Sequence, residues 1–193
     1  VCGWIAYTTY DDILDHEDSP QSLSTANMYA RRVMSIYEHR FTDQRDMDFF
    51  RAIMDKIDLA NIWEIAHCRA TVRSNILSFN TLPSFGDYSM LADKSLGHAL
   101  GPIQIMSRLG FHTNSKESTA VLRFFKHYII ARQLNDDAHD WLDDLSKGHI
   151  NPVNCAVLKE LHKRTKINLA GEKQKLQEIF WYKIIFHVHK DIF

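Results

Sequence analysis

Hydrophobic positions along the chain recur mostly at helical spacing, and runs that alternate between hydrophobic and polar residues are scarce. Helix-breaking residues are also sparse, with 7 glycines and 4 prolines among 193 residues. The clearest breaks fall at 82–87, 110–115 and 147–152. The pattern predicts an all-α fold, a bundle of long helices around a deep centre. The expected helices cover residues 1–17, 22–41, 44–80, 88–109, 115–146, 152–165 and 169–190.

The length and the hydrophobic content of the chain favour one folded unit. A chain of 193 residues, 45% of them hydrophobic, can bury one substantial core, so we expect a single domain over residues 1–193. The chain opens on Val1 inside an apolar helical pattern, without an initiator methionine or a capping residue. We therefore expect a fragment that lacks preceding helices and begins just before the first acidic motif.

Charge and cysteine content exclude several classes of function. The formal net charge of −1 gives no overall basic field for binding nucleic acid. The longest apolar runs are too short to cross a bilayer, which predicts a soluble protein without a transmembrane segment. The three cysteines, Cys2, Cys68 and Cys155, are far apart and form no CxxC motif. They are typical of buried thiols in a reducing compartment, so we expect a cytoplasmic protein.

Two short segments concentrate carboxylates within helical patterns. The first reads Asp-Asp-Ile-Leu-Asp at 11–15, and the second reads Asn-Asp-Asp-Ala-His-Asp at 135–140. Residues four apart share one face of a helix, where like charges repel each other. Each segment therefore carries an electrostatic cost that a bound cation would offset. The six aspartates are Asp11, Asp12, Asp15, Asp136, Asp137 and Asp140.

Carboxylate oxygens are hard ligands, and they select Mg²⁺ or Mn²⁺ over zinc. Magnesium keeps some of its waters and shares its coordination shell with substrate phosphates. Two such helices on opposite walls of one cavity would therefore bind a diphosphate through several metal ions.

The two segments resemble the aspartate-rich motifs of class I isoprenoid synthases, most closely those of trans-polyprenyl diphosphate synthases. The family's second motif usually reads Phe-Gln-hydrophobic-x-Asp-Asp-x-x-Asp, and residues 132–140 match it with Arg132 in place of the aromatic residue. Residues 93–102 resemble the family's helix that carries a diphosphate-binding lysine, here Lys94. Residues 143–152 resemble the stretch that carries a second such lysine, Lys147, and also resemble a segment of squalene and phytoene synthases.

This resemblance implies an all-α fold with a central cavity. It also implies a polyprenyl synthetase-like transferase or a terpene synthase, with about three Mg²⁺ ions or Mn²⁺ in their place, that ionises an allylic prenyl diphosphate. By the same resemblance, the metal ligands would be Asp11, Asp15, Asp136 and Asp140. Asp12 and Asp137 would bind the metal directly or through a bridging group. The residues expected to bind the diphosphate are Lys94, Arg132, Gln133 and Lys147. Trp4, Tyr7 and Thr8, which precede the first motif, would line the prenyl pocket.

One departure from the family limits the expected reaction. Chain-elongating members usually carry an arginine pair four or five residues after the first motif, and this chain has Ser19 and Pro20 there. Ionisation of one diphosphate is therefore favoured over condensation of two. Two alternatives remain open, a non-catalytic subunit of a heteromeric prenyl synthase and an all-α metal-dependent pyrophosphohydrolase. A homodimer is also compatible with the sequence.

Overall fold

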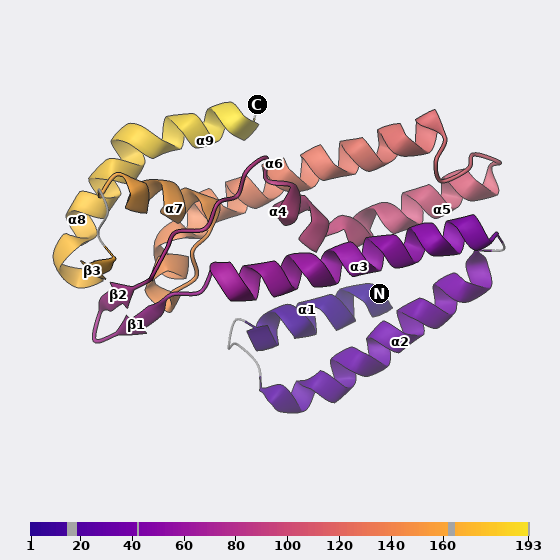
Figure 1. The fold of residues 1–193 in the computed structure, drawn as a ribbon, viewed down its shortest axis with the longest axis horizontal. Helices are drawn as coiled ribbons and strands as arrows, with labels where there is room; N and C mark the ends of the chain where they lie inside the picture. Colours follow the sequence, from indigo (N-terminus) through magenta and orange to yellow (C-terminus); the bar gives the residue numbers. More distant parts are fainter. Residues whose placement is uncertain (15–18, 42, 162–164, 193) are drawn as a thin grey trace. The chain divides into compact units, whose positions relative to one another are not determined.

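The computed structural model describes residues 1–14, 19–41, 43–161 and 165–192, and most of them lie in helices (Figure 1). Contacts along the chain divide it into two units. The first contains Val1–Ile57 and Leu96–Arg123, and the second contains Asp58–Ser95 and Phe124–Phe193. Helices α3 (Gln44–His67) and α6 (Lys116–Lys147) contribute residues to both units. The predicted organisation as one domain stays a prediction.

Within the described residues of the first unit, the regular elements are all helices. Tyr37 near the end of α2 stacks on Phe50 of α3, with ring centroids 4.6 Å apart, and on Phe41, at 5.7 Å. Phe41 and Phe50 are buried, so this aromatic stack forms part of the unit's core. Besides parts of α3 and α6, the unit contains α1 (Cys2–Leu14), η1 (Pro20–Ser22), α2 (Leu23–Arg40), η2 (Leu96–Ala99) and α5 (Leu100–Arg108).

The second unit combines helices with a small antiparallel sheet. The sheet has the strand order β1-β2-β3, and Leu77 of β2 pairs with Val72 of β1 and with Ile167 of β3. Besides parts of α3 and α6, the unit contains β1 (Thr71–Arg73), β2 (Ile76–Ser78), α4 (Ser89–Lys94), α7 (Pro152–Lys159), β3 (Lys166–Asn168), α8 (Leu169–Ile179), the π-helical turn η3 (Phe180–Ile184) and α9 (Ile185–Ile192).

The sheet corrects the predicted helix over residues 44–80, which ends at His67. Residues 71–78 instead form a hairpin, whose two turn residues, Ser74 and Asn75, have φ angles of 49° and 64°. Positive φ at both central positions is typical of a two-residue hairpin turn, and asparagine tolerates it better than most residues. The prediction of a mostly helical chain is confirmed, whereas the prediction that the fold is all-α is wrong. The central cavity stays a prediction.

A buried stripe on α6 organises the core of the second unit. Leu134, Trp141 and Leu145 are buried on one side of the helix, and the Trp141 ring stacks on Phe180 of η3 with centroids 4.9 Å apart. Asp137 lies between Leu134 and Trp141 in the same stripe and is only 4% exposed. The second acidic motif therefore has one of its carboxylates on the buried side of α6.

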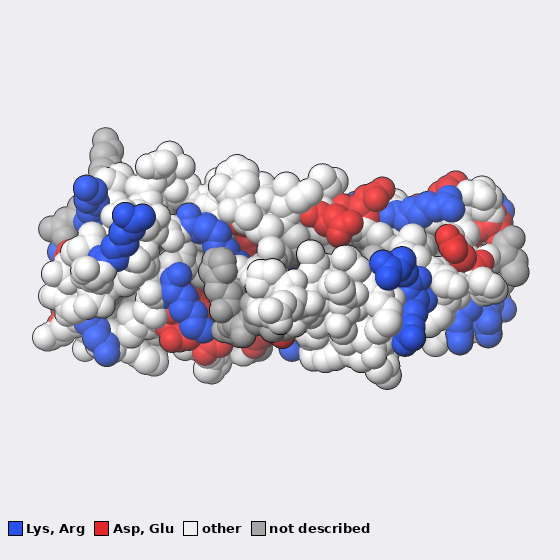
Figure 2. All heavy atoms as spheres, turned by 90° about the horizontal axis from the view of Figure 1, so that it is seen from below, with Lys and Arg blue, Asp and Glu red and all other residues white. Residues whose placement is uncertain are grey.

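Charged side chains are dispersed over the face of the molecule that Figure 2 shows. In the face shown in Figure 2, lysine and arginine side chains are separated by acidic and uncharged ones. Within the described ranges, no helix is both long enough and apolar enough to cross a membrane.

Candidate functional site

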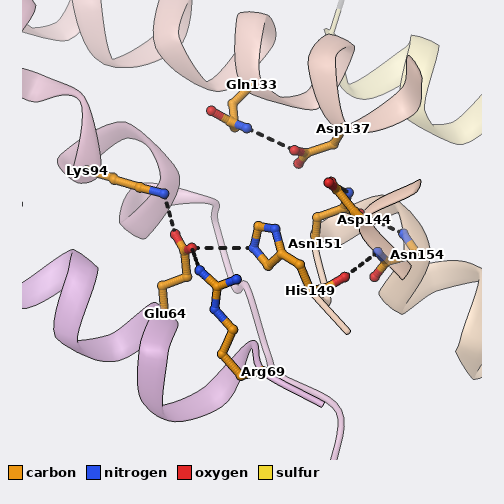
Figure 3. A network of polar contacts seen from close by, with 9 residues as sticks. All are labelled: Glu64, Arg69, Lys94, Gln133, Asp137, Asp144, His149, Asn151 and Asn154. Carbon is orange, nitrogen blue, oxygen red and sulfur yellow. Dashed lines mark hydrogen bonds and ion pairs between the residues drawn. The ribbon is translucent and has the colours of Figure 1, made fainter. Parts of the chain in front are cut away.

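Three basic side chains converge on Glu64 in the second unit (Figure 3). Glu64 lies near the end of α3, and its side chain is 12% exposed. Its Oε2 lies 2.9 Å from Lys94 Nζ, and its Oε1 lies 3.3 Å from Arg69 Nη2 and 3.4 Å from His149 Nε2. The three partners come from three places in the chain: the residues after α3, the end of α4, and the loop between α6 and α7. The carboxylate of Glu64 therefore contacts side chains from three separate segments of the chain.

The basic partners keep Glu64 ionised. Burial acts to raise the pKa of the Glu64 carboxyl, but the hydrogen bond with His149 and the charge of Lys94 outweigh it and lower this pKa to about 2. Glu64 is therefore a fixed negative charge throughout the physiological pH range.

For the carboxyl of Asp137, in contrast, the effect of burial outweighs that of its partners. Its Oδ1 accepts a hydrogen bond of 2.9 Å from Gln133 Nε2, while its Oδ2 is buried with no hydrogen-bond partner in the described structure. Burial raises the pKa of Asp137 to about 7, against the lowering effects of Gln133 and His149. The negative charges of Asp144 and Glu64 raise it further. A carboxylate held in this way has unused capacity to accept a hydrogen bond or to bind a cation.

An asparagine network fixes the loop between α6 and α7. Asn151 Nδ2 donates to Asp144 Oδ2 at 2.8 Å, and Asn151 Oδ1 caps α7 by accepting from the Asn154 backbone N–H, also at 2.8 Å. Asn154 Nδ2 donates to the carbonyl oxygen of His149 at 2.8 Å. Burial raises the pKa of Asp144, and the hydrogen bond from Asn151 opposes this rise. The loop that carries His149 is thereby held from both of its ends.

Gly148 allows this loop to approach the segment after α3. Its φ is +84°, and a Cβ atom there would lie 2.5 Å from the carbonyl oxygen of Ala70. Backbone hydrogen bonds join the two segments on either side, from Ala70 N–H to Gly148 at 2.7 Å and from Ile150 N–H to Cys68 at 2.8 Å. Only glycine fits both the backbone conformation and the close contact.

Some of these side chains line a cavity of about 40 Å³, which is room for a few water molecules or a small polar group. Its wall is mixed, because charged and amide side chains alternate with apolar ones. The polar lining residues are Glu64, Lys94, Gln133, Asp137, His149 and Asn151, and the apolar ones include Trp63, Phe85, Met90 and Leu91.

The structure brings three of the sequence-predicted residues together at this cavity, namely Lys94, Gln133 and Asp137. Other predicted residues of the second unit lie on the exposed side of α6. Asp136 is exposed, with its Oδ2 3.7 Å from Arg132 Nε, and Asp140 is exposed as well.

Lys147 also lies on the exposed side of α6. Its Nζ is 3.1 Å from Asp143 Oδ2, and both side chains are exposed. The cavity is instead lined by His149, two residues further along the chain.

The residues predicted around the first motif belong to the first unit. Asp11 and Asp12 lie in the last turns of α1, and Asp15 lies outside the described residues. Tyr7 points its hydroxyl at Met54 Sδ, 3.7 Å away, and Thr8 Oγ1 donates to the carbonyl oxygen of Trp4 at 2.8 Å. The expected pairing of the two motifs across one cavity stays a prediction.

Three polar residues of the cavity wall, Glu64, His149 and Asn151, were missed by the sequence reasoning. Glu64 stands in a long amphipathic helix, where an isolated glutamate usually faces solvent. His149 had one available signal, since Asn151 followed by Pro152 is typical of a helix N-terminus that fixes the preceding loop.

The carboxylates of α6 are compatible with a magnesium ion that is shared with a phosphate ligand. Among the described residues, no three His, Cys, Asp or Glu side chains group closely enough to hold a metal by themselves. Magnesium is usually held by one or two carboxylates, with waters and substrate phosphates completing its shell. Asp136 and Asp140, one turn apart and exposed, are carboxylates of this kind, whereas Asp137 is buried and lines the cavity instead.

Comparison with known proteins finds no matching family model, no similar curated protein and no similar solved structure. The function of the chain is therefore inferred from its own residues and their geometry.

Proposed function

We propose that this chain is a magnesium-dependent enzyme, similar to class I isoprenoid synthases, that ionises an allylic prenyl diphosphate. The observation that supports this proposal most is the position of Lys94 beside Gln133 and Asp137 at one cavity. The resemblance to the family selected Lys94 from one segment and the other two residues from another, on sequence alone. Their meeting at one cavity supports the grouping that the resemblance gave these three residues.

The residues of the proposed site have two kinds of role, one electrostatic and one through hydrogen bonds. Asp136 and Asp140 would hold magnesium on the exposed side of α6. When bound, the metal would stabilise the negative charge that accumulates on the departing diphosphate. On that side of the helix Arg132, whose Nε lies 3.7 Å from Asp136 Oδ2, would supply positive charge to the phosphate oxygens. The Gln133 amide orients Asp137 through its hydrogen bond.

The proposed reaction uses one diphosphate. Ser19 and Pro20 stand where chain-elongating relatives would carry an arginine pair, and paired arginines are suited to a second diphosphate through bidentate hydrogen bonds. We therefore propose ionisation, followed by rearrangement or capture of the cation, ahead of condensation with isopentenyl diphosphate.

The test is incubation of the chain with Mg²⁺ and a panel of allylic diphosphates of different lengths. Inorganic diphosphate release and hydrocarbon products are both measured. Asp136→Ala and Asp140→Ala should each lower the release rate by about 100-fold or more, because each removes a metal ligand. Asp55→Ala, which removes an exposed helical aspartate outside both motifs, is the matched control and should retain the wild-type rate.

The same assay separates the alternatives. Wild-type chain that releases no diphosphate from any allylic substrate would overturn the proposal. Hydrolysis of nucleoside triphosphates instead would indicate the pyrophosphohydrolase, and binding without release would indicate the non-catalytic subunit.

A further inference from the structure

We propose that the exposed aromatic side chains of η3 and α9 form a docking surface for an anionic lipid bilayer. This aromatic face consists of Trp181, Tyr182 and Phe186, all of which are exposed. The inference is carried by the second unit alone and does not rest on the proposed function.

The segment that carries the aromatic face has a second apolar side, which the fold does bury. Phe180, Ile184 and Val188, spaced four residues apart, belong to the core of the second unit. The three side chains of the aromatic face are instead 59%, 80% and 71% exposed. A helix that is hydrophobic around most of its circumference is usually buried all round. The aromatic face therefore indicates a partner that the second unit itself does not supply.

The part of the chain around this face is basic. Residues 152–193 contain 8 lysines and arginines against 4 aspartates and glutamates, a net charge of +4. The whole chain carries −1, so residues 1–151 carry −5. Next to the aromatic face, Lys183, His187 and Lys190 are exposed, and Lys183 Nζ lies 2.6 Å from Glu160 Oε2. A basic surface of this kind is complementary in charge to anionic lipid headgroups.

The combination of aromatic and basic side chains favours a bilayer over other partners. Tryptophan and tyrosine gather at membrane interfaces because each joins an apolar ring to a polar atom, and lysine stems reach from there to the headgroups. A second copy docked through the same face would bring two basic segments together, and they would repel each other. The overall charge of −1 gives no long-range attraction for an extended nucleic acid.

The chain would lie on the bilayer without crossing it. Helix α9 and the turn η3 continue the chain from α8 and are short, with 8 and 5 residues (Figure 1). Within the described ranges, no helix could span a membrane. Amphipathic helices at the interface bury their apolar side at the boundary between headgroups and acyl chains. Because the aromatic face is already exposed, this insertion requires no unfolding of the core.

The test measures co-sedimentation of the chain with vesicles of phosphatidylcholine, either pure or with about one third phosphatidylserine. Wild type should bind the anionic vesicles at least about 5-fold more tightly, because lysines near an anionic surface are attracted to it. The double variant Tyr182→Ser/Phe186→Ser should weaken that binding by about 10-fold or more, because two rings no longer leave water.

The matched control is Phe124→Ser/Tyr128→Ser. It removes another exposed phenylalanine and tyrosine, 62% and 53% exposed, which have the same four-residue spacing on α6. Binding of this control should stay within about two-fold of wild type, as is usual for surface substitutions. An equal loss in both double variants would overturn the inference.

Tryptophan fluorescence locates the inserted face and decides the question if the first double variant does not fold. Anionic vesicles should shift the emission of wild type to shorter wavelength, and Trp181→Phe should remove most of this shift while keeping the binding. A full shift in Trp181→Phe would place the contact elsewhere and overturn the inference.

Three further results would also overturn it. They are failure of wild type to bind either kind of vesicle, equal binding to pure phosphatidylcholine, and tighter binding to a nucleic acid oligomer than to the anionic vesicles. None of these results bears on diphosphate release, so the proposed function is tested separately.

Discussion

Glu64 at the end of α3 and Asp137 in the middle of α6 are two largely buried carboxyls on one cavity wall, and they have opposite surroundings. Three basic groups contact Glu64, whose pKa is lowered to about 2. Asp137 has one amide donor and one unpartnered oxygen, and its pKa is raised to about 7. Burying a carboxylate is costly unless cations or hydrogen bonds compensate it. Glu64 is compensated within the fold, whereas Asp137 is not, and uncompensated buried acids are typical of functional sites.

Truncating Glu64 should have the largest effect on stability. Glu64→Ala leaves Arg69, Lys94 and His149 partly buried without their shared carboxylate. We expect the free energy of unfolding to fall by roughly 3–5 kcal/mol, as for other broken buried ion pairs. Urea denaturation at neutral pH measures it. A loss below about 1 kcal/mol would mean that the cluster behaves as a surface ion pair, and the contrast with Asp137 would disappear.

Replacing Asp137 should show that this carboxyl, unlike Glu64, lowers the free energy of unfolding as the pH rises. The folded chain holds the Asp137 proton up to about pH 7, whereas the unfolded chain releases it near the ordinary value of 3.8. Wild-type stability should therefore fall relative to Asp137→Asn as the pH rises from about 4 to about 7, by on the order of 3 kcal/mol.

The contribution of Glu64 to the free energy of unfolding should change with pH in the reverse direction, and it should do so at acid pH. Because its folded pKa is about 2 against an ordinary value of 4.5, its stabilising effect is complete above pH 4.5. Wild type should lose stability relative to Glu64→Gln as the pH falls from 4.5 towards 2. Denaturation series across both ranges check the two signs, and parallel curves for the wild type and either variant would refute the corresponding shift.

A smaller effect is expected at the loop that carries His149. Asn151→Ala removes the cap of α7 and the hydrogen bond to Asp144, and should lower the free energy of unfolding by about 1–2 kcal/mol. Asn168→Ala removes the comparable cap of α8, where the side chain accepts from Gly171 N–H at 2.9 Å. Thermal denaturation compares the two. Asn151→Ala should lose more stability than Asn168→Ala, because it also loses the hydrogen bond to Asp144, and equal losses would show that this hydrogen bond adds nothing to the cap.

The sequence predicted the helices better than the site. Helix α6 was expected over 115–146 and spans Lys116–Lys147, because its hydrophobic stripe is long and regular. The hairpin was missed because its turn, Ser74-Asn75, has neither glycine nor proline. Helical spacing correctly grouped Asp136 with Asp140, but it could not show that Asp137 is the aspartate that enters the core. No local sequence pattern could identify Glu64 as a site residue, since its partners lie in segments that meet it only in the folded chain.

The central claim, magnesium-dependent recognition of an allylic diphosphate, is tested most directly by calorimetric titration of the wild-type chain. The ligands are a thiolo analogue of farnesyl diphosphate, which resists ionisation, and isopentenyl diphosphate, each with and without Mg²⁺. The account predicts binding of the allylic analogue that requires Mg²⁺ and is lost in Asp136→Ala, together with weak or absent binding of isopentenyl diphosphate. Allylic binding that is indifferent to Mg²⁺ and to Asp136→Ala, or tight binding of isopentenyl diphosphate, would contradict it.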